Sequence, residues 1–143
     1  MNFFCCTSFS LIAQEYINSE NYKFKGTYNL NKLENIISLF NGLFEKYAPS
    51  LVIIEKPAPV RHSKAVTSLN QVFGAIVATA IVRDIHVNEV HNKTVKKTFN
   101  YKTKGEAIDR ARFIINSPKA DITEHEADAI LVVETYKEII KWL

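Results

Sequence analysis

One short segment does most to limit the folds open to this chain. Residues 51–55 (Leu-Val-Ile-Ile-Glu) form a continuous apolar run that ends on a carboxylate, and Pro57 and Pro59 follow closely. An apolar run of this length is typical of a strand buried on both faces of a sheet, and the prolines end it. We therefore expect a central strand that holds Glu55 at its carboxyl end, with helices on both faces.

Helical periodicity on either side of this strand supplies those covering layers. Apolar residues recur at helical spacing from Leu33 to Tyr47, with Asn31 as the expected N-cap and Pro49 after the helix end. A second apolar stripe spans residues 69–80 and contains small residues that allow close packing. Both segments are predicted to be amphipathic helices.

The later part of the chain continues the alternation. In chain order it contains a predicted strand at 85–90, a lysine-rich segment at 91–104 and a short helix at 108–115. Thr123 and Glu126 then form a capping box that opens a last helix running to about residue 142. Residues 3–12 are predicted to be a strand, 18–21 a turn and 22–28 its antiparallel partner. These elements predict one α/β domain over residues 1–143, a mixed sheet flanked by helices.

Charge and cysteine content say little about function. The formal net charge is only +3, so any nucleic-acid surface depends on where the lysines lie. The two cysteines, Cys5 and Cys6, are adjacent and too few for a disulfide framework, which favours a reducing, cytoplasmic setting. No window reaches the roughly 18 to 20 apolar residues of a membrane span, so we expect no membrane partner.

Candidate chemistry lies where charged groups are held on rigid elements. Glu55 ends an apolar strand, and sites in open α/β sheets lie beyond such strand ends. His125 and Asp128 are three residues apart, so they share one face of the last helix. Each has a plain structural alternative, a polar strand end for Glu55 and a solvated first helical turn for the other two. Glu124 and Glu126 point about 100° to either side of His125 and rank lower as ligands.

Three motifs resemble the RuvC family of Holliday-junction resolvases, which belongs to the RNase H superfamily. Residues 51–55 resemble the family's fourth strand with its catalytic glutamate, and residues 69–75 (Leu-Asn-Gln-Val-Phe-Gly-Ala) resemble the start of the following helix. Residues 125–129 (His-Glu-Ala-Asp-Ala) resemble the closing signature, which has aspartate or histidine first and then aspartate. The matches stand in the family's order and together cover nearly the whole chain. The resemblance implies an RNase H-like, mixed five-stranded sheet.

The resemblance also implies a metal-dependent DNA endonuclease that resolves four-way junctions in recombination and repair. Glu55, His125 and Asp128 would be the catalytic residues and the metal ligands. Two divalent ions, Mg²⁺ with Mn²⁺ as a substitute, would activate water and stabilise the leaving oxygen. A four-way junction has twofold symmetry, so a homodimer is implied, with the helix at residues 69–82 as the candidate interface.

Two basic clusters would bind phosphates, although lysines in loops also serve solubility. They comprise Lys56, Arg61 and Lys64 after the glutamate strand, and Lys93, Lys96, Lys97, Lys102 and Lys104 later in the chain. The family's usual glycine pair is absent from the second cluster, where Asn100 and Tyr101 stand instead.

The main departure from the family is at the N-terminus. RuvC proteins have a central first strand that ends in a catalytic aspartate, whereas no aspartate precedes Asp84 here. We expect that strand to be missing, because the chain is either N-terminally incomplete, which the intact later motifs favour, or a degenerate homologue. Three other readings remain open: a branched-DNA-binding protein without catalysis, an RNase H-like nuclease for other branched DNA, and an unrelated α/β domain.

Overall fold

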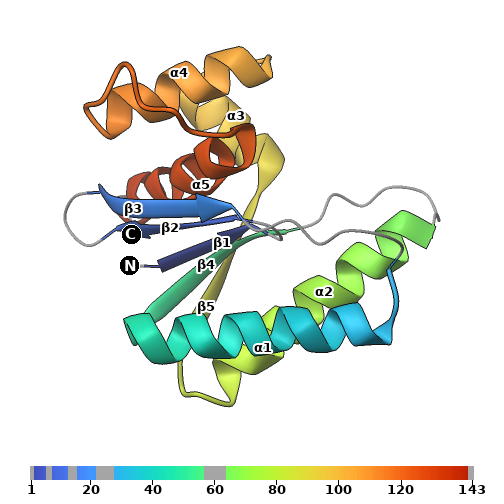
Figure 1. Ribbon diagram of the computed structural model, residues 1–143. Helices are drawn as coiled ribbons and strands as arrows, with labels where there is room; N and C mark the ends of the chain where they lie inside the picture. Colours follow the sequence, from blue (N-terminus) through green and yellow to red (C-terminus); the bar gives the residue numbers. More distant parts are fainter. Residues whose placement is uncertain (1, 6–7, 13–15, 22–27, 57–63, 142–143) are drawn as a thin grey trace.

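The computed structural model of the chain describes residues 2–5, 8–12, 16–21, 28–56 and 64–141. Five strands form one mixed sheet in the order β3-β2-β1-β4-β5 (Figure 1). The strands are β1 (Asn2–Cys5), β2 (Ser8–Ile12), β3 (Tyr16–Asn21), β4 (Leu51–Lys56) and β5 (His86–His91). Strands β1, β4 and β5 are parallel to one another, and β2 runs antiparallel to both of its neighbours. The predicted five-stranded α/β architecture is confirmed.

The centre of the sheet is occupied, contrary to the expected gap. Strand β1 pairs with β4 in parallel, with Asn2 opposite Val52 and Phe4 opposite Ile54, and pairs with β2 on its other side. Strand β1 has only four residues, but three of them pair with the buried part of β4, and this pairing fills the centre of the sheet. The expectation of a missing central strand was therefore wrong. No catalytic aspartate was expected on the first strand, and β1, which reads Asn-Phe-Phe-Cys, carries no acid.

The predicted opening hairpin was also placed incorrectly. Residues 3–12 form the two strands β1 and β2 rather than one, and the predicted turn at 18–21 lies inside β3. Residues Asn18, Ser19 and Asn21 are common in turns, but β3 is an edge strand, where polar residues are well tolerated. Of the partner strand predicted at 22–28, all but Tyr28 lies outside the described residues, and Tyr28 lies in no strand.

Two long helices cover one face of the sheet. Helices α1 (Leu30–Tyr47) and α2 (Lys64–Ile81) enclose a core that includes Val52 and Ile54 of β4 (Figure 1). The N-cap of α1 is Asn29 and not the predicted Asn31, because the Asn29 side chain accepts a 3.0 Å hydrogen bond from the backbone N–H of Lys32. Both predicted helices are confirmed, and each starts a few residues earlier than predicted.

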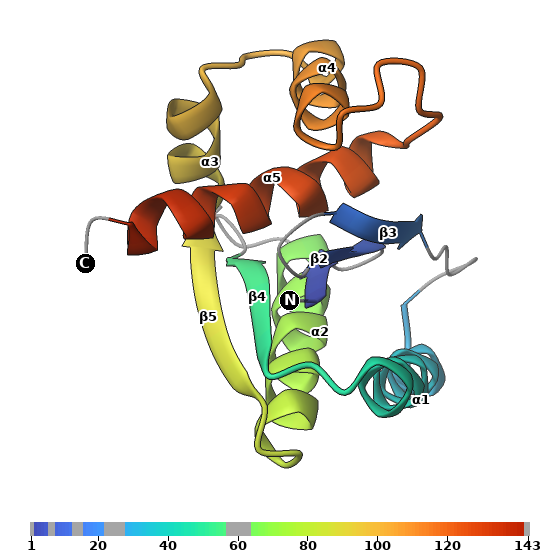
Figure 2. The ribbon, with the colours of Figure 1, turned by 90° about the vertical axis from the view of Figure 1, so that its left-hand side faces the viewer.

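Three helices cover the other face. They are α3 (Asn92–Phe99), α4 (Lys104–Ile114) and α5 (Glu124–Ile140), and α5 lies across the strands (Figure 2). Their core includes Ile53 of β4 and Val90 of β5. The Thr123–Glu126 capping box of α5 is confirmed. Helix α3 was not predicted, because its sequence is mostly polar and only Val95 of its eight residues is buried.

The described helices share one further property. None of them combines the length and the apolar character that crossing a membrane would require. Their apolar side chains instead form the two layers of core that sandwich the sheet. Strand β4 contributes to both layers, and this double burial explains its unbroken apolar run.

Candidate active site at the carboxyl end of β4

Strand geometry sets the direction of Glu55. Side chains alternate along a strand, so Val52 and Ile54 face α1 and α2 while Ile53 faces α5. Glu55 therefore shares the face of Ile53 and lies beneath α5. The carboxylate is half-buried, and its Oε1 accepts a 2.7 Å hydrogen bond from Nδ2 of Asn92. Burial raises the pKa of Glu55, and the Asn92 hydrogen bond and the nearby Lys96 ammonium oppose that rise.

Asp128 brings a second carboxylate to the same place. It lies in the second turn of α5, between the fully buried Ala127 and Ala129, and is itself half-buried. Burial, and then the charge of Glu55, raise the pKa of Asp128 to about 6, while His125 acts in the opposite direction. Two carboxylates from distant parts of the chain thus share one partly desolvated site and disfavour each other's ionisation.

Tyr101 is buried close to both carboxylates. Its side chain is 6% exposed and packs in the core under α5, and Asn100 precedes it in the left-handed backbone conformation with φ 48°. Burial raises the pKa of Tyr101, and the charges of Asp128 and Glu55 raise it further, so the phenol stays neutral. The sequence interpretation noted Tyr101 but assigned it no role. The signal was a large aromatic residue, close to Phe99, in an otherwise polar and lysine-rich segment.

His125 lies at the outer side of the site. Its side chain is 45% exposed, and its Nε2 is 3.8 Å from Oε1 of Glu124. The same Glu124 oxygen accepts a 2.8 Å bond from Nζ of Lys104, while Glu126 bonds the backbone N–H of Thr123 at 2.9 Å. One oxygen of Glu126 thus serves the helix cap.

The oxygen donors of this site suit a hard divalent cation, although the number of donor side chains is small. The described residues contain no group of three or more His, Cys, Asp and Glu side chains close enough to hold a metal ion. Glu55 and Asp128 nevertheless form a partly desolvated pair of like charges, and a divalent cation would relieve their repulsion. The hydrogen bond from Asn92 uses one oxygen of Glu55, Oε1. The imidazole of His125 lies near Asp128. The two carboxylates therefore suit a divalent cation that keeps water ligands, whereas His125 does not complete a three-ligand group with them in this structure.

The predicted basic residues divide into three groups. Lys93, Lys97 and Lys102 are exposed on or just after α3, and Lys96 lies near Glu55. Lys56 and Lys104 form ion pairs, with Glu89 at 3.4 Å and with Glu124 at 2.8 Å. Arg61 lies outside the described residues, and Lys64 begins α2 without a described side chain.

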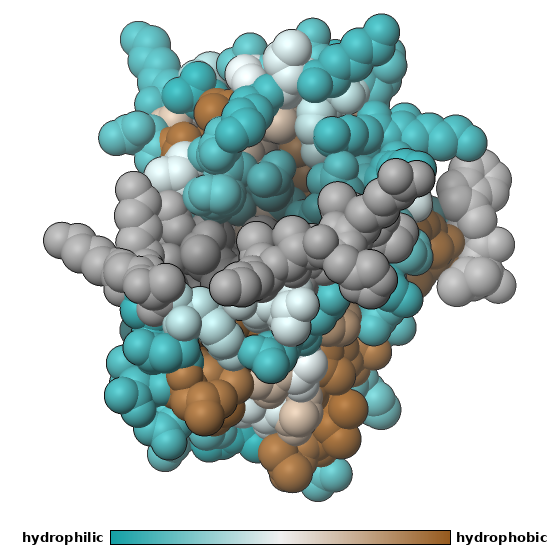
Figure 3. All heavy atoms as spheres, turned by 90° about the vertical axis from the view of Figure 1, so that its right-hand side faces the viewer, coloured by the Kyte–Doolittle hydropathy of each residue, from teal (hydrophilic) through white to brown (hydrophobic). Residues whose placement is uncertain are grey.

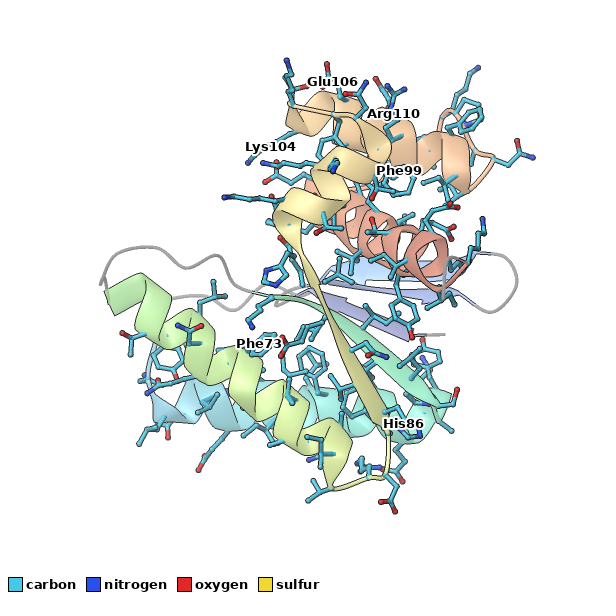
Figure 4. All side chains as sticks on the ribbon, turned by 180° about the vertical axis from the view of Figure 1, so that it is seen from behind. Phe73, His86, Phe99, Lys104, Glu106 and Arg110 are labelled. Carbon is cyan, nitrogen blue, oxygen red and sulfur yellow. The ribbon has the colours of Figure 1, made fainter. Side chains whose placement is uncertain are left out.

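The surface around the site is divided by polarity. Lys104, Glu106 and Arg110 project from α4 on the α5 side of the sheet, while His86 lies at the far end of β5 (Figure 4). Hydrophilic side chains gather over α3 and α4, whereas larger apolar areas lie over α1 and α2 (Figure 3). Exposed apolar residues of the latter region include Leu69, Ile81 and Val82. The carboxylates thus lie on the α3 and α4 side of the sheet, with Lys96 near Glu55 and Lys104 near Asp128.

Comparison with known proteins identifies the fold and the family of this chain. Two solved structures share the fold: "T. thermophilus RuvC in complex with Holliday junction substrate" and "Thermus thermophilus RuvC structure", with TM-scores of 0.75 and 0.74. Each is 16% identical, and each alignment covers 96% of this chain and 93% of the other. The curated protein sequences gave no significant match. The family model described as "Crossover junction endodeoxyribonuclease RuvC" matches residues 6–136. With its fold and its family match in agreement, this chain belongs to the RuvC family.

Proposed function

We propose that this protein is a metal-dependent endonuclease that hydrolyses phosphodiester bonds in branched DNA, with the four-way junction as its principal substrate. The observation that carries the proposal is that Glu55 of β4 and Asp128 of α5 meet at one end of the sheet, 73 positions apart in sequence, within a RuvC fold. A RuvC structure of the same fold was solved with a Holliday junction substrate, which supports this choice of substrate.

Glu55 and Asp128 are the proposed metal ligands, with Mg²⁺ as the natural ion and Mn²⁺ as a substitute. The bound metal would supply an activated water and charge stabilisation for the departing oxygen. His125 is exposed enough to meet a phosphodiester, so it would orient the attacking water, or would approach the metal only after a change in its side-chain position. The buried Tyr101 ring would limit the access of water to the carboxylates, which would strengthen their interaction with a cation.

DNA binding is assigned to the lysine-bearing surface beside the site. Lys93, Lys97 and Lys102 are exposed there and suit contacts to phosphates. Lys56 and Lys104 would exchange their carboxylate partners for phosphates, and Lys96, Arg61 and Lys64 complete the proposed surface. A homodimer would match the twofold symmetry of a junction, and the exposed Leu69, Ile81 and Val82 offer apolar area for it around α2.

The direct test is cleavage of an end-labelled four-way junction with Mg²⁺ or Mn²⁺. Glu55→Gln and Asp128→Asn are expected to lose cleavage while still binding the junction. Glu45→Gln is a matched control, because Glu45 is exposed on α1, which covers the opposite face of the sheet. Flaps and plain duplexes, run alongside, would show whether another branched substrate is preferred. Cleavage that survives in both site variants would refute the proposal.

One observation favours a second function, junction binding without cleavage. Strand β1 lies beside β4 but carries no carboxylate, so the site lacks an acid from the central strand. Under this alternative, the unaltered chain would bind junctions tightly and cut none of them with either metal. Glu55→Gln would then bind as the unaltered chain does.

A further inference from the structure

The start of α3 lies directly beside the end of β4. Strand β5 pairs with β4 in parallel, with Glu55 opposite Val90 and Lys56 opposite His91. Helix α3 begins at the next residue, Asn92, without an intervening loop. The register of the two strands therefore sets Asn92 next to Glu55, although 37 positions separate them in sequence.

The Asn92–Glu55 contact is short and specific. Nδ2 of Asn92 donates to Oε1 of Glu55 at 2.7 Å, and the pair is partly buried. An ionised carboxylate only accepts hydrogen bonds, so the amide nitrogen must face it. The amide is uncharged and leaves the carboxylate charge uncompensated. The bond thus orients Glu55 without neutralising it.

The other neighbours of Glu55 do not replace this bond. Lys96, one turn after Asn92 on the same face of α3, acts on Glu55 through its charge. Tyr101 is a buried, neutral phenol near Glu55 and Asp128, and Asp128 repels Glu55. Among the described residues, Asn92 is the side chain that holds a Glu55 oxygen by a hydrogen bond, and it holds Oε1.

We propose that Asn92 is a positioning residue that holds the Glu55 carboxylate in a single orientation for a divalent cation. This inference rests on the proposed function, since it assigns a partner to the metal ligand Glu55. A glutamate side chain released from its anchor samples several rotamers, and each bound cation would have to select one of them. Hydrogen-bond partners of metal ligands typically contribute 10- to 100-fold to metal affinity.

The test measures Mn²⁺ binding by isothermal titration calorimetry, with no DNA present. Asn92→Leu keeps the approximate shape of the side chain and removes the donor. Asn88→Ala is the matched control, because Asn88 also donates from its amide, to the hydroxyl of Tyr136 at 3.1 Å, away from the carboxylates. We expect a loss of roughly tenfold or more in Mn²⁺ affinity for Asn92→Leu and no change for Asn88→Ala. Junction cleavage by Asn92→Leu should lose kcat and keep the junction affinity.

A second comparison covers the case of general damage to the fold. In a Glu55→Gln background, Asn92→Leu should leave the residual Mn²⁺ affinity unchanged, since the carboxylate that it positions is gone. Equal losses in both backgrounds would overturn the inference, as would unchanged affinity for Asn92→Leu alone. If the unaltered chain binds no Mn²⁺, the proposed function fails and this inference with it. If it binds Mn²⁺ and Asn92→Leu binds equally well, only the inference fails.

Discussion

Replacing Asp128 with asparagine should make the metal-free protein more stable while it abolishes cleavage. Asp128 is held half-buried beside Glu55, and its pKa is raised from 3.8 to about 6. Such a rise corresponds to a destabilisation of about 3 kcal/mol when the carboxyl is ionised. Because the side chain still contacts solvent, we reduce this figure to about 1–2 kcal/mol. Asparagine has nearly the same shape and carries no charge, so the variant should recover that free energy.

The effect has a defined pH dependence. The folded pKa lies above the unfolded value, so ionising Asp128 lowers stability as pH rises from about 4 to about 6, and the cost is complete near pH 7. The advantage of Asp128→Asn should therefore be full at pH 7, fall to about half at pH 5 and vanish below about pH 4.

Urea unfolding in EDTA at pH 7 and pH 5, followed by circular dichroism, measures both quantities. Asp121→Asn is the matched control, because Asp121 is an exposed aspartate just ahead of α5, and it should change stability little at either pH. Added Mn²⁺ should stabilise the unaltered chain and leave Asp128→Asn nearly unaffected, since binding to the folded state alone raises stability. An Asp128→Asn variant that is no more stable than the unaltered chain at pH 7 would refute the reasoning.

Three further predictions concern other parts of the molecule. Tyr101→Ala should lower the free energy of unfolding by about 3–5 kcal/mol, because it empties a site buried under α5; a loss below 1 kcal/mol in thermal melts would contradict the assigned packing. Replacing Lys93 and Lys97 together by alanine should weaken junction binding and flatten its salt dependence by about two in a log–log gel-shift plot, whereas Lys46→Ala on α1 should do neither. Asn29→Ala should cost about 1 kcal/mol in urea unfolding through loss of the α1 cap, and an unchanged midpoint would argue against that cap.

The predictable parts of this fold were those encoded locally. The run at residues 51–55 and the Thr123–Glu126 box carry their own signals of burial and capping, and both were predicted correctly. Helix α3 was missed because it is held by the packing of Val95, which contacts distant parts of the chain. The pairing of β1 with β4 was missed for the same reason, since four residues carry too little pattern to choose a partner.

In the candidate site, too, residues with a local sequence signal could be predicted and residues that depend on long-range contacts could not. Glu55 could be named as a candidate because a carboxylate at the end of an apolar strand departs from ordinary packing. Asp128 was named from its spacing to His125 and from the resemblance of residues 125–129 to the closing signature of the RuvC family. Asn92 and Tyr101 could not be assigned roles, because their importance comes from contacts with residues far along the chain. Polar residues in a lysine-rich segment give no local sign of such contacts.

The ion pair between Lys104 and Glu124 changes how this protein would respond to salt. Glu124 accepts a hydrogen bond from Lys104, and under the proposed function a DNA phosphate would have to displace this carboxylate. If DNA displaced the carboxylate, a counterion would leave the phosphate, but another cation would be drawn to the freed carboxylate. The net number of ions released, and with it the salt dependence of binding, would be smaller. Lys56, paired with Glu89, behaves in the same way. A simple count of lysines would therefore overstate the salt sensitivity of junction binding, and the protein would hold branched DNA over a wider range of ionic strength than its basic surface suggests.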